Sequence, residues 1–486
     1  MTDDLAELTD AAKITSGSEL AGQSGAPPAS HGRLLSAVMF GVASGAILVP
    51  LNSTMLAVAL PGVMDDFGLG ASTVTALVSL YLGSVAIALP IAGSLGDRYG
   101  ARRIFLVGVL GFGAASIVAT FASTFVILEA SRVLQAVSGA LVSTSSAALI
   151  RETAPADRRG EAFGLFDLLV STSAAVGPFV GGVIVGLLGW RVVFFVAVPI
   201  SLLAALLVGL LVRPDATRTR GASEDRRTLD IPGLVLLALA IAAFLIAIRA
   251  IGGVDPTVQL IAALAIVPLL AAFVLVELRE ARPAVDPRLL TRRTFSAALI
   301  GVFGATVVLH GSFILVPLLV ERLLGDSATT SGIVLLGIAG VAAIVSPFGG
   351  RISDRRGRRI VVVAGSFVSA VGLLILSLPA AIASAAIVAV LLGVVGFGNG
   401  LTSPRQAAAL ESVEPERVGM AAGTYYTGRY LGGVVGASLA GAVLGATVTA
   451  GGITLGFAIL ASVMVVVTLA SLGLPGRRAA GEAAPA

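Results

Sequence analysis

The chain has 486 residues, of which 56% are hydrophobic and only 12% are charged, and its formal net charge at pH 7 is +4. Soluble domains carry about 25% charged residues, so this composition excludes a water-soluble globular fold and predicts a protein embedded in lipid. The arginines are scattered over many short segments, which argues against a nucleic-acid-binding protein. Cysteine is absent, which excludes disulfides and thiol chemistry.

The amino-terminal segment is polar and acidic and then rich in Ser, Gly and Pro, without the basic start and apolar core of a signal peptide. It is predicted to be a disordered cytoplasmic tail. After it come apolar segments of about 20 residues or more, the length that crosses a bilayer as a helix. We predict fourteen spans, at roughly 34–60, 70–92, 103–123, 125–150, 161–188, 191–212, 231–250, 257–278, 294–320, 329–349, 360–379, 381–404, 418–447 and 451–474.

The basic residues are distributed unequally between the predicted loops. An even number of spans places both termini on one side, and most of the arginines fall on that side, including Arg405 and Arg417 between spans twelve and thirteen. The opposite side holds only Arg191, Arg249 and Arg322. Because basic loops stay in the cytoplasm, we expect a multi-pass protein of the cell's inner (plasma) membrane with both termini cytoplasmic.

Two loops on the basic side share one pattern. GSLGDRYGARR (93–103) and GRISDRRGRR (350–359) repeat glycine, aspartate and arginine in one register, 257 positions apart. Two sets of six spans, separated by two extra spans, explain this offset, and duplicated halves are an architecture of secondary transporters. The predicted domains are a disordered tail (1–33), an N-terminal six-helix bundle (34–213), a cytoplasmic linker with two extra helices (214–293), a C-terminal six-helix bundle (294–474) and a second cytoplasmic tail (475–486).

The first of these loops has residues suited to a mechanical role. Gly93 and Gly100 are expected to allow a close backbone approach and a tight turn. Asp97 can face the positive N-terminal end of a neighbouring helix, and Arg102 can pair with an acid such as Glu152. The alternative is that the arginines only fix the topology. The predicted conformational latch consists of Gly93, Asp97, Arg98, Gly100, Arg102, Glu152, Asp354 and Arg355.

Several stretches resemble signatures of the major facilitator superfamily, and in particular of its fourteen-helix drug:proton antiporters of the DHA2 type. GSLGDRYGARR (93–103) resembles the family's cytoplasmic loop, and LEASRVLQAVSGA (128–140) resembles its fourth-helix motif. SAAVGPFVGG (173–182) resembles the fifth-helix antiporter motif. The borders of the two extra helices are resembled by LDIPGLVLL (229–237) and RPAVDPRLLTRRTFS (282–296). Ala136 and Ser173 stand where the family has glycine. The resemblance implies an all-α integral membrane protein with two pseudo-symmetric six-helix bundles and two extra helices. It also implies a loop latch that favours the outward-open state.

Charged residues within spans are costly in lipid and usually functional. Arg132 shares one face of span four with Gln135, and Glu129 lies one turn away, where it can pair with Arg132. The resemblance implies that this arginine helps proton movement by tuning a nearby acid. Asp167, about two turns inside span five, is the first candidate for the proton carrier. The alternative is that its carboxyl group remains hydrated at the end of the helix and has no role in coupling. Asp167, Arg132 and Glu129 form the predicted proton-coupling set.

The antiporter motif combines a helix bend with small residues. Pro178 removes a backbone hydrogen bond, and Gly177, Gly181 and Gly182 let another helix pack tightly against the bend. The alternative is an ordinary packing motif without a role in coupling.

Span one departs from the family pattern at Asn52, where the fourteen-helix relatives usually carry aspartate. Asparagine cannot titrate, so either Asp167 or, second, Glu129 carries the proton, or coupling is weakened or absent. The predicted substrate cavity contains Asn52, Thr54, Tyr81, Gln135, His310, Asn399, Tyr425 and Arg429. For the residues of the second half there are alternatives to a role in the cavity. His310 can instead form a hydrogen bond between helices, and Asn399 and the tyrosines can serve packing alone.

The sequence has no G-x-x-x-x-G-K-[ST] phosphate loop, no metal-ligand cluster and no plausible catalytic triad, so we expect neither an ATP motor nor an enzyme. The predicted function is proton-coupled efflux of amphipathic small molecules by alternating access. It requires no cofactor besides the proton motive force, and its partners are substrate, protons and lipid, with a functional monomer. The alternatives are a facilitator or proton-linked importer of a metabolite, and a membrane receptor built on a transporter fold.

Overall fold

The computed structural model describes residues 29–154, 159–212, 231–247, 255–280, 283, 286–414 and 417–476. Most of both predicted tails and of the central linker therefore lies outside the described residues. The first half contains α2 (Ala29–Phe67), α3 (Ala71–Val74), α4 (Ala76–Tyr99), α5 (Ala101–Thr120), α6 (Phe125–Thr153), α7 (Arg159–Leu188), α8 (Val192–Phe195) and α9 (Ala197–Leu211). Two helices follow, α10 (Ile231–Ala247) and α11 (Pro256–Arg279). The second half contains η2 (Pro287–Thr291), α12 (Arg293–Pro317), η3 (Leu318–Leu323), α13 (Ala328–Arg356), α14 (Arg358–Leu376), η4 (Pro379–Ile382), α15 (Ala385–Leu401), α16 (Pro404–Leu410), α17 (Val418–Leu444) and α18 (Ala450–Ser471).

Within the described residues, 12 helices are long and apolar enough to cross a membrane. The all-helical membrane architecture is therefore confirmed, whereas the predicted count of fourteen spans is not. The helices at the positions of predicted spans seven and thirteen, α10 and α17, are not among these 12. α10 has only 17 residues, and α17 has 27 but contains Arg429 and many glycines, which lower its hydropathy.

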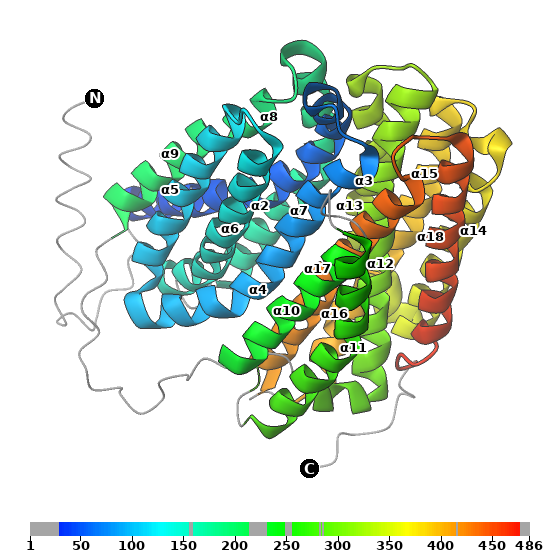
Figure 1. The fold of residues 1–486 in the computed structure, drawn as a ribbon. Coiled ribbons are helices and arrows are strands. Elements are labelled where there is room, and N and C mark those ends of the chain that lie inside the picture. Colours follow the sequence, from blue (N-terminus) through cyan, green and yellow to red (C-terminus); the bar gives the residue numbers. More distant parts are fainter. Residues whose placement is uncertain are drawn as a thin grey trace, which may run out of the picture.

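The 257-residue offset of the two loops extends through both halves. Shifted by 257, residues 71–99 of α3 and α4 become 328–356, which are the bounds of α13. The same shift moves α5 onto 358–377, and α14 ends one residue earlier. Figure 1 shows the helices of the first half, blue to teal, gathered on one side and those of the second half, yellow-green to red, on the other. The duplication predicted from one short motif thus describes the helices of both bundles.

The repeated loop turns at the same glycine in both halves. Gly100 has φ 92° and Gly357 has φ 89°, and each separates two long helices. Residues with a Cβ rarely adopt this region, so the predicted tight turn at Gly100 is confirmed. The close backbone approach predicted at Gly93 is not found, because a Cβ built there meets nothing within 4 Å.

This difference predicts opposite effects for two alanine substitutions in one loop. Gly100→Ala forces a side chain into a strained backbone conformation and should lower the free energy of unfolding by about 1–3 kcal/mol. Gly93→Ala is the matched control, since it lies inside α4 with open space around it and should be neutral or stabilising by about 0.5–1 kcal/mol. Thermal unfolding of both variants in detergent measures the difference, and equal changes would contradict the strain argument.

The halves meet through α4 on α17, α7 on α13 and α2 on α12. We call the end where α4 leads to α5 and α13 to α14 the arginine-rich end, and the opposite end, where α2 stops at Phe67, the arginine-poor end. Near the arginine-poor end, the hydroxyl oxygens of Ser79 in α4 and Ser438 in α17 are 2.9 Å apart. Close by, the backbone N–H of Ser72 donates to the carbonyl of Gly445 at 3.1 Å.

An ion pair joins the halves at the same end. Nη2 of Arg322, in the π-helical turn η3, donates to Oδ1 of Asp65 at 2.6 Å and to the carbonyl of Pro61 at 2.8 Å. Asp65 and Arg322 are themselves 257 positions apart, so they occupy equivalent places in the two halves. The duplicated position carries opposite charges, and pseudo-symmetry brings them together across the junction.

Candidate functional site

A buried arginine is the centre of a polar cluster in the first half. Arg132 in α6 is fully buried, and its Nη1 donates to Oδ1 of Asn52 in α2 at 2.6 Å and to Oε1 of Gln135 at 2.7 Å. The guanidinium carbon lies 4.1 Å from the ring centre of Tyr81 in α4, within the range of a cation–π contact. Nε2 of Gln135 donates to Oγ of Ser116 in α5 at 2.7 Å. Three helices therefore supply one hydrogen-bonded group, and α4 adds an aromatic contact to it.

The guanidinium is bonded to amides and to no carboxylate among the described residues. Glu129, the predicted partner, is half-buried one turn away, and the Arg132 side chain reaches instead across to α2. The predicted Glu129–Arg132 ion pair is therefore not formed. Nε and Nη2 of Arg132 and Nδ2 of Asn52 are buried without a hydrogen-bond partner in the described part of the chain. The arrangement is thus a buried cation with spare N–H donors.

This cluster has no counterpart in the second half, although the helices are duplicated. Adding 257 to Asn52, Tyr81, Arg132 and Gln135 gives Leu309, Ile338, Ala389 and Leu392. All four equivalents are apolar. The duplication therefore sets the fold, while this particular polar cluster is found only in the first bundle.

The antiporter motif lies in α7, where two helices approach its glycines. A Cβ at Gly177 would be 1.9 Å from Oγ1 of Thr54, and one at Gly181 would be 2.9 Å from the Cα of Met55, both in α2. Thr54 itself is buried and donates to the carbonyl of Pro50 at 2.9 Å. These contacts lie within the first half.

The next glycine of the motif meets the other half. A Cβ at Gly182 would be 2.5 Å from the carbonyl oxygen of Ala328 in α13, and one at Gly332 would be 2.5 Å from the carbonyl oxygen of Pro178. The hydroxyl of Thr329 donates to the carbonyl of Gly182 at 3.2 Å. The predicted tight packing of this motif is confirmed, and its last glycine belongs to the junction between the halves.

Asp167 and Arg132 lie toward different ends of the molecule. Asp167 is exposed and lies about 12 Å along α7 from its start near the arginine-rich end, at 1.5 Å of rise per residue. Arg132 lies about 10 Å along α6 from its start near the arginine-poor end. The structure therefore does not bring the two predicted proton-coupling residues together.

The predicted latch residues of the first loop are arranged differently from the expectation. Nη2 of Arg102 donates to the carbonyl of Gly209 in α9 at 2.6 Å, and Glu152 is exposed. The predicted Arg102–Glu152 pair is not formed, because a backbone carbonyl of a helix packed against α5 takes the guanidinium. The Arg98 guanidinium carbon lies 5.3 Å from the Tyr99 ring centre, at the exposed end of α4. In the second loop, Asp354 and Arg355 are exposed.

The predicted cavity residues of the second half are divided between packing and exposure. Nδ1 of His310 lies 3.1 Å from the carbonyl of Thr306, one turn earlier, an arrangement typical of a helix hydrogen bonder. Oδ1 of Asn399 accepts from Ser369 at 3.4 Å. Tyr425 is buried, with its ring 6.3 Å from that of Tyr426, whereas Tyr426 and Arg429 are exposed.

Arg405 is a polar residue of the core that the sequence placed in a loop. Its side chain is only 3% exposed, and it donates to the carbonyl of Gly301 at 2.7 Å and to Oγ of Ser366 at 3.2 Å. The loop prediction was wrong because the helix breaks at 402–403 and resumes as α16, which carries Arg405 back between α12 and α14. The proline at position 404, favourable as the first residue of a helix, is the sequence signal for this restart.

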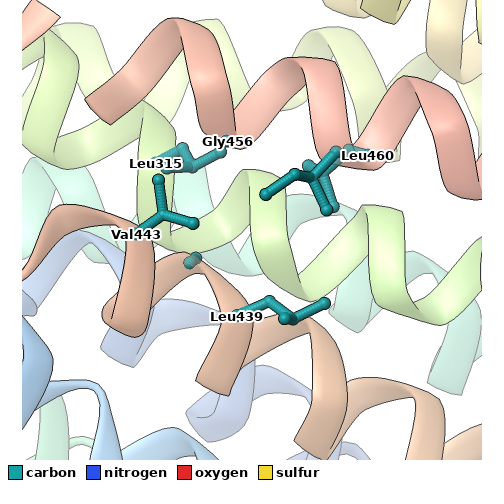
Figure 2. Close-up of a pocket in the computed structure, with 7 residues that line it drawn as sticks. Leu315, Leu439, Val443, Gly456 and Leu460 are labelled. Carbon is teal, nitrogen blue, oxygen red and sulfur yellow. The ribbon is translucent and has the colours of Figure 1, made fainter. Parts of the chain in front are cut away.

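A small pocket in the second half lies between α12, α17 and α18 and is lined by Leu315, Leu439, Ala440, Val443, Gly456, Ile459 and Leu460 (Figure 2). Its lining has no polar side chain. It therefore offers nothing to orient a polar substrate or to hold a proton.

Comparison with known sequences assigns the family. The sequence model of the Major Facilitator Superfamily matches residues 42–437 and 298–485. The uncharacterized MFS-type transporter YwoD of Bacillus subtilis (strain 168) is 32% identical over 442 residues, 90% of this chain and 96% of that protein. The tetracenomycin C resistance and export protein of Streptomyces glaucescens is 30% identical over 406 residues, 82% of this chain and 74% of the relative. Multidrug resistance protein Stp of Mycobacterium tuberculosis (strain CDC 1551 / Oshkosh) is 29% identical over 400 residues, which cover 81% of this chain and 72% of that protein.

Solved structures show the same fold. A mutant of the peptide transporter POT superposes with a TM-score of 0.67 at 16% identity, covering 95% of this chain and 97% of that one. A bacterial homolog of the human lysosomal transporter Spinster, in an inward-facing and unoccupied conformation, gives a TM-score of 0.66 at 15% identity, with 93% and 98% covered. These relatives and neighbours are transporters and not enzymes. The chain therefore belongs to the major facilitator superfamily of membrane transporters.

Proposed function

We propose that this protein is a proton-coupled exporter of amphipathic small molecules that works by alternating access between its two halves. The observation that carries this proposal is the one-sided junction. Near the arginine-poor end the halves are held by glycine contacts, hydrogen bonds and the Asp65–Arg322 pair. Exposed apolar side chains occur toward both ends of α7 and α13, such as Leu168 and Leu187, so the proposal rests on the position of these contacts and not on exposure. A junction closed at one end is one state of a rocking transporter.

The names of two relatives and the distribution of charge support the proposed direction of transport. Two relatives at about 30% identity are named for drug resistance or export, which favours efflux over uptake. Because basic loops stay inside, we place the arginine-rich end and both termini in the cytoplasm of the plasma membrane, which makes this conformation inward-facing. We also propose that α10 and α17 cross the bilayer and complete fourteen spans in a functional monomer. α17 is about 40 Å long at 1.5 Å per residue, enough for the hydrocarbon core.

The Asp65–Arg322 pair should hold the arginine-poor end closed. Asp65→Arg places two guanidinium groups in contact, so we expect this end to open and a cysteine at Ser438 to become labelled about tenfold faster by an impermeant maleimide. The chain has no cysteine of its own, so Ser438→Cys can be read directly. The doubly reversed variant Asp65→Arg/Arg322→Asp should return to the slow rate. A double variant that stays fast would show that the pair does not close the junction.

The experiment for the whole proposal uses purified protein in sealed liposomes with ΔpH and voltage imposed separately. A one-for-one proton antiporter gains about 1.4 kcal/mol per pH unit, and voltage supplies about 2.3 kcal/mol per 100 mV for each charge moved. We expect substrate to move against the proton flow and to accumulate. Flux indifferent to both gradients would refute the proposal.

A second candidate is a facilitator or proton-linked importer of a metabolite. Asn52 favours it, because the residue bonded to Arg132 cannot release a proton. In the same liposomes a facilitator equilibrates its substrate without accumulation, and an importer moves it in the direction of the protons.

A further inference from the structure

The polar cluster of the first half has an electrical imbalance. Arg132 is fully buried, and its described bonding partners, Asn52 and Gln135, are neutral amides. A charge removed from water costs several kcal/mol unless an opposite charge or several hydrogen bonds compensate it. Amide oxygens supply two hydrogen bonds and the Tyr81 ring a cation–π contact, but none of them supplies a negative charge.

The remaining donors of the cluster are adjacent in space. Asn52 presents its carbonyl oxygen to Arg132, and the same side chain keeps Nδ2 without an acceptor in the described residues. Nε and Nη2 of Arg132 are likewise without one. Three N–H-bearing atoms of two contacting side chains thus lack acceptors around one positive charge. A carboxylate or a halide ion is the partner that matches such a set, because both accept several hydrogen bonds and carry one negative charge.

Tyr81 closes the cluster on the side of α4. Its ring covers the guanidinium, and its hydroxyl makes only a long bond, 3.4 Å, to the carbonyl of Val49. Tyr430 of α17 packs against the buried hydrophobic cluster to which Tyr81 belongs. Ser79, two residues before Tyr81, is bonded to Ser438 of the second half. Because side chains two residues apart on a helix point to different sides, α4 presents Ser79 to α17 and the Tyr81 ring to Arg132, inside the first half.

We propose that Arg132, Asn52 and Tyr81 form a binding site for a monovalent anion, and that the exported amphipath carries its own negative charge to this arginine. The inference rests on the proposed export function and specifies its substrate class. A carboxylate on a hydrophobic body fits both the guanidinium and the aromatic cover. A free halide would use the same donors, so the experiment treats the two sources separately.

The test measures binding to the purified full-length protein in detergent, from the shift of its unfolding midpoint with ligand concentration at constant ionic strength in sodium sulfate. The probes are benzoate, its uncharged analogue benzamide, and chloride. We expect benzoate to bind with a dissociation constant on the order of 1 mM and benzamide to bind at least about tenfold more weakly. Stabilisation by chloride and not by benzoate would assign the site to a free halide and overturn the substrate class.

Asn52→Asp is the decisive variant, since it is nearly isosteric and supplies a fixed negative charge. It should weaken benzoate binding at least about tenfold while the protein stays folded. Gln406→Glu, an amide-to-carboxylate change in α16 of the second half, should leave the affinity unchanged. The proposal would be overturned if the wild type and the Asn52→Asp variant bound benzoate with equal affinity. It would also be overturned if neither benzoate nor chloride stabilised the wild type at 100 mM, a concentration about a hundredfold above the expected dissociation constant. Because no gradient is involved, anion binding without transport would refute the export function alone, and export without anion selectivity would refute this site alone.

Discussion

Asp167→Asn is expected to uncouple transport from the proton gradient. Asp167 is exposed on α7 toward the arginine-rich end, where, in the proposed inward-facing conformation, it can exchange protons with the cytoplasm. An amide cannot do so. With two pH units imposed, one-for-one antiport by the wild type can sustain a substrate ratio of up to about 100, whereas the variant should stay near 1. The measurement is the steady-state substrate ratio in liposomes.

The control for this prediction lies on the same helix. Glu161, in the first turn of α7, is also exposed, and Glu161→Gln removes an equal charge from the same end. It should retain the wild-type ratio. Substrate binding should survive in Asp167→Asn, because Arg132 and its amide partners lie toward the other end of the molecule. An Asp167→Asn variant that still accumulates substrate would make Glu129 the remaining candidate of the predicted proton-coupling set.

Gly182→Ala is expected to prevent closure of the arginine-poor end. Its Cβ would be 2.5 Å from the carbonyl oxygen of Ala328 and 3.1 Å from the Cα of Gly332, and backbone atoms cannot move aside as a flexible side chain can. The clash is relieved when α7 and α13 separate, so the variant should fold but remain open at this end. Transport that needs both states should then fall at least about a hundredfold, the effect of a bias of about 2.7 kcal/mol between two states.

Gly164→Ala provides the matched control in α7, because a Cβ there meets nothing within 4 Å. It should transport normally. Maleimide labelling of Ser438→Cys in each background distinguishes an open junction from a misfolded protein, since only the former combines fast labelling with a normal unfolding midpoint. A Gly182→Ala protein with slow labelling and full transport would show that α7 and α13 need no close contact.

A relationship between the charges at the arginine-poor end was not predicted from the sequence. Asp65 and Arg322 are 257 positions apart, and this offset is visible in the two loops. The pair had no obvious signal, because a single acid and a single arginine do not form a motif. The pairing is recognisable only in the structure, because the pseudo-twofold arrangement of the halves brings these equivalent positions together across the axis.

The sequence by itself determined the solvent, the helical class and the duplication. Apolar segments of bilayer length leave the backbone no alternative to helices, and a glycine such as Gly100 marks a turn that other residues resist. Both signals are local, or repeat at one fixed offset, and are readable without knowing which helices touch.

Only the tertiary structure decided the partners of the buried charges. Arg132 faces Asn52 instead of Glu129, and Arg405 reaches Gly301 inside the second bundle instead of solvent. Helix periodicity gives the face on which a residue lies, but the neighbour of that face depends on how helices far apart in sequence pack, and a long arginine side chain can reach any of several helices.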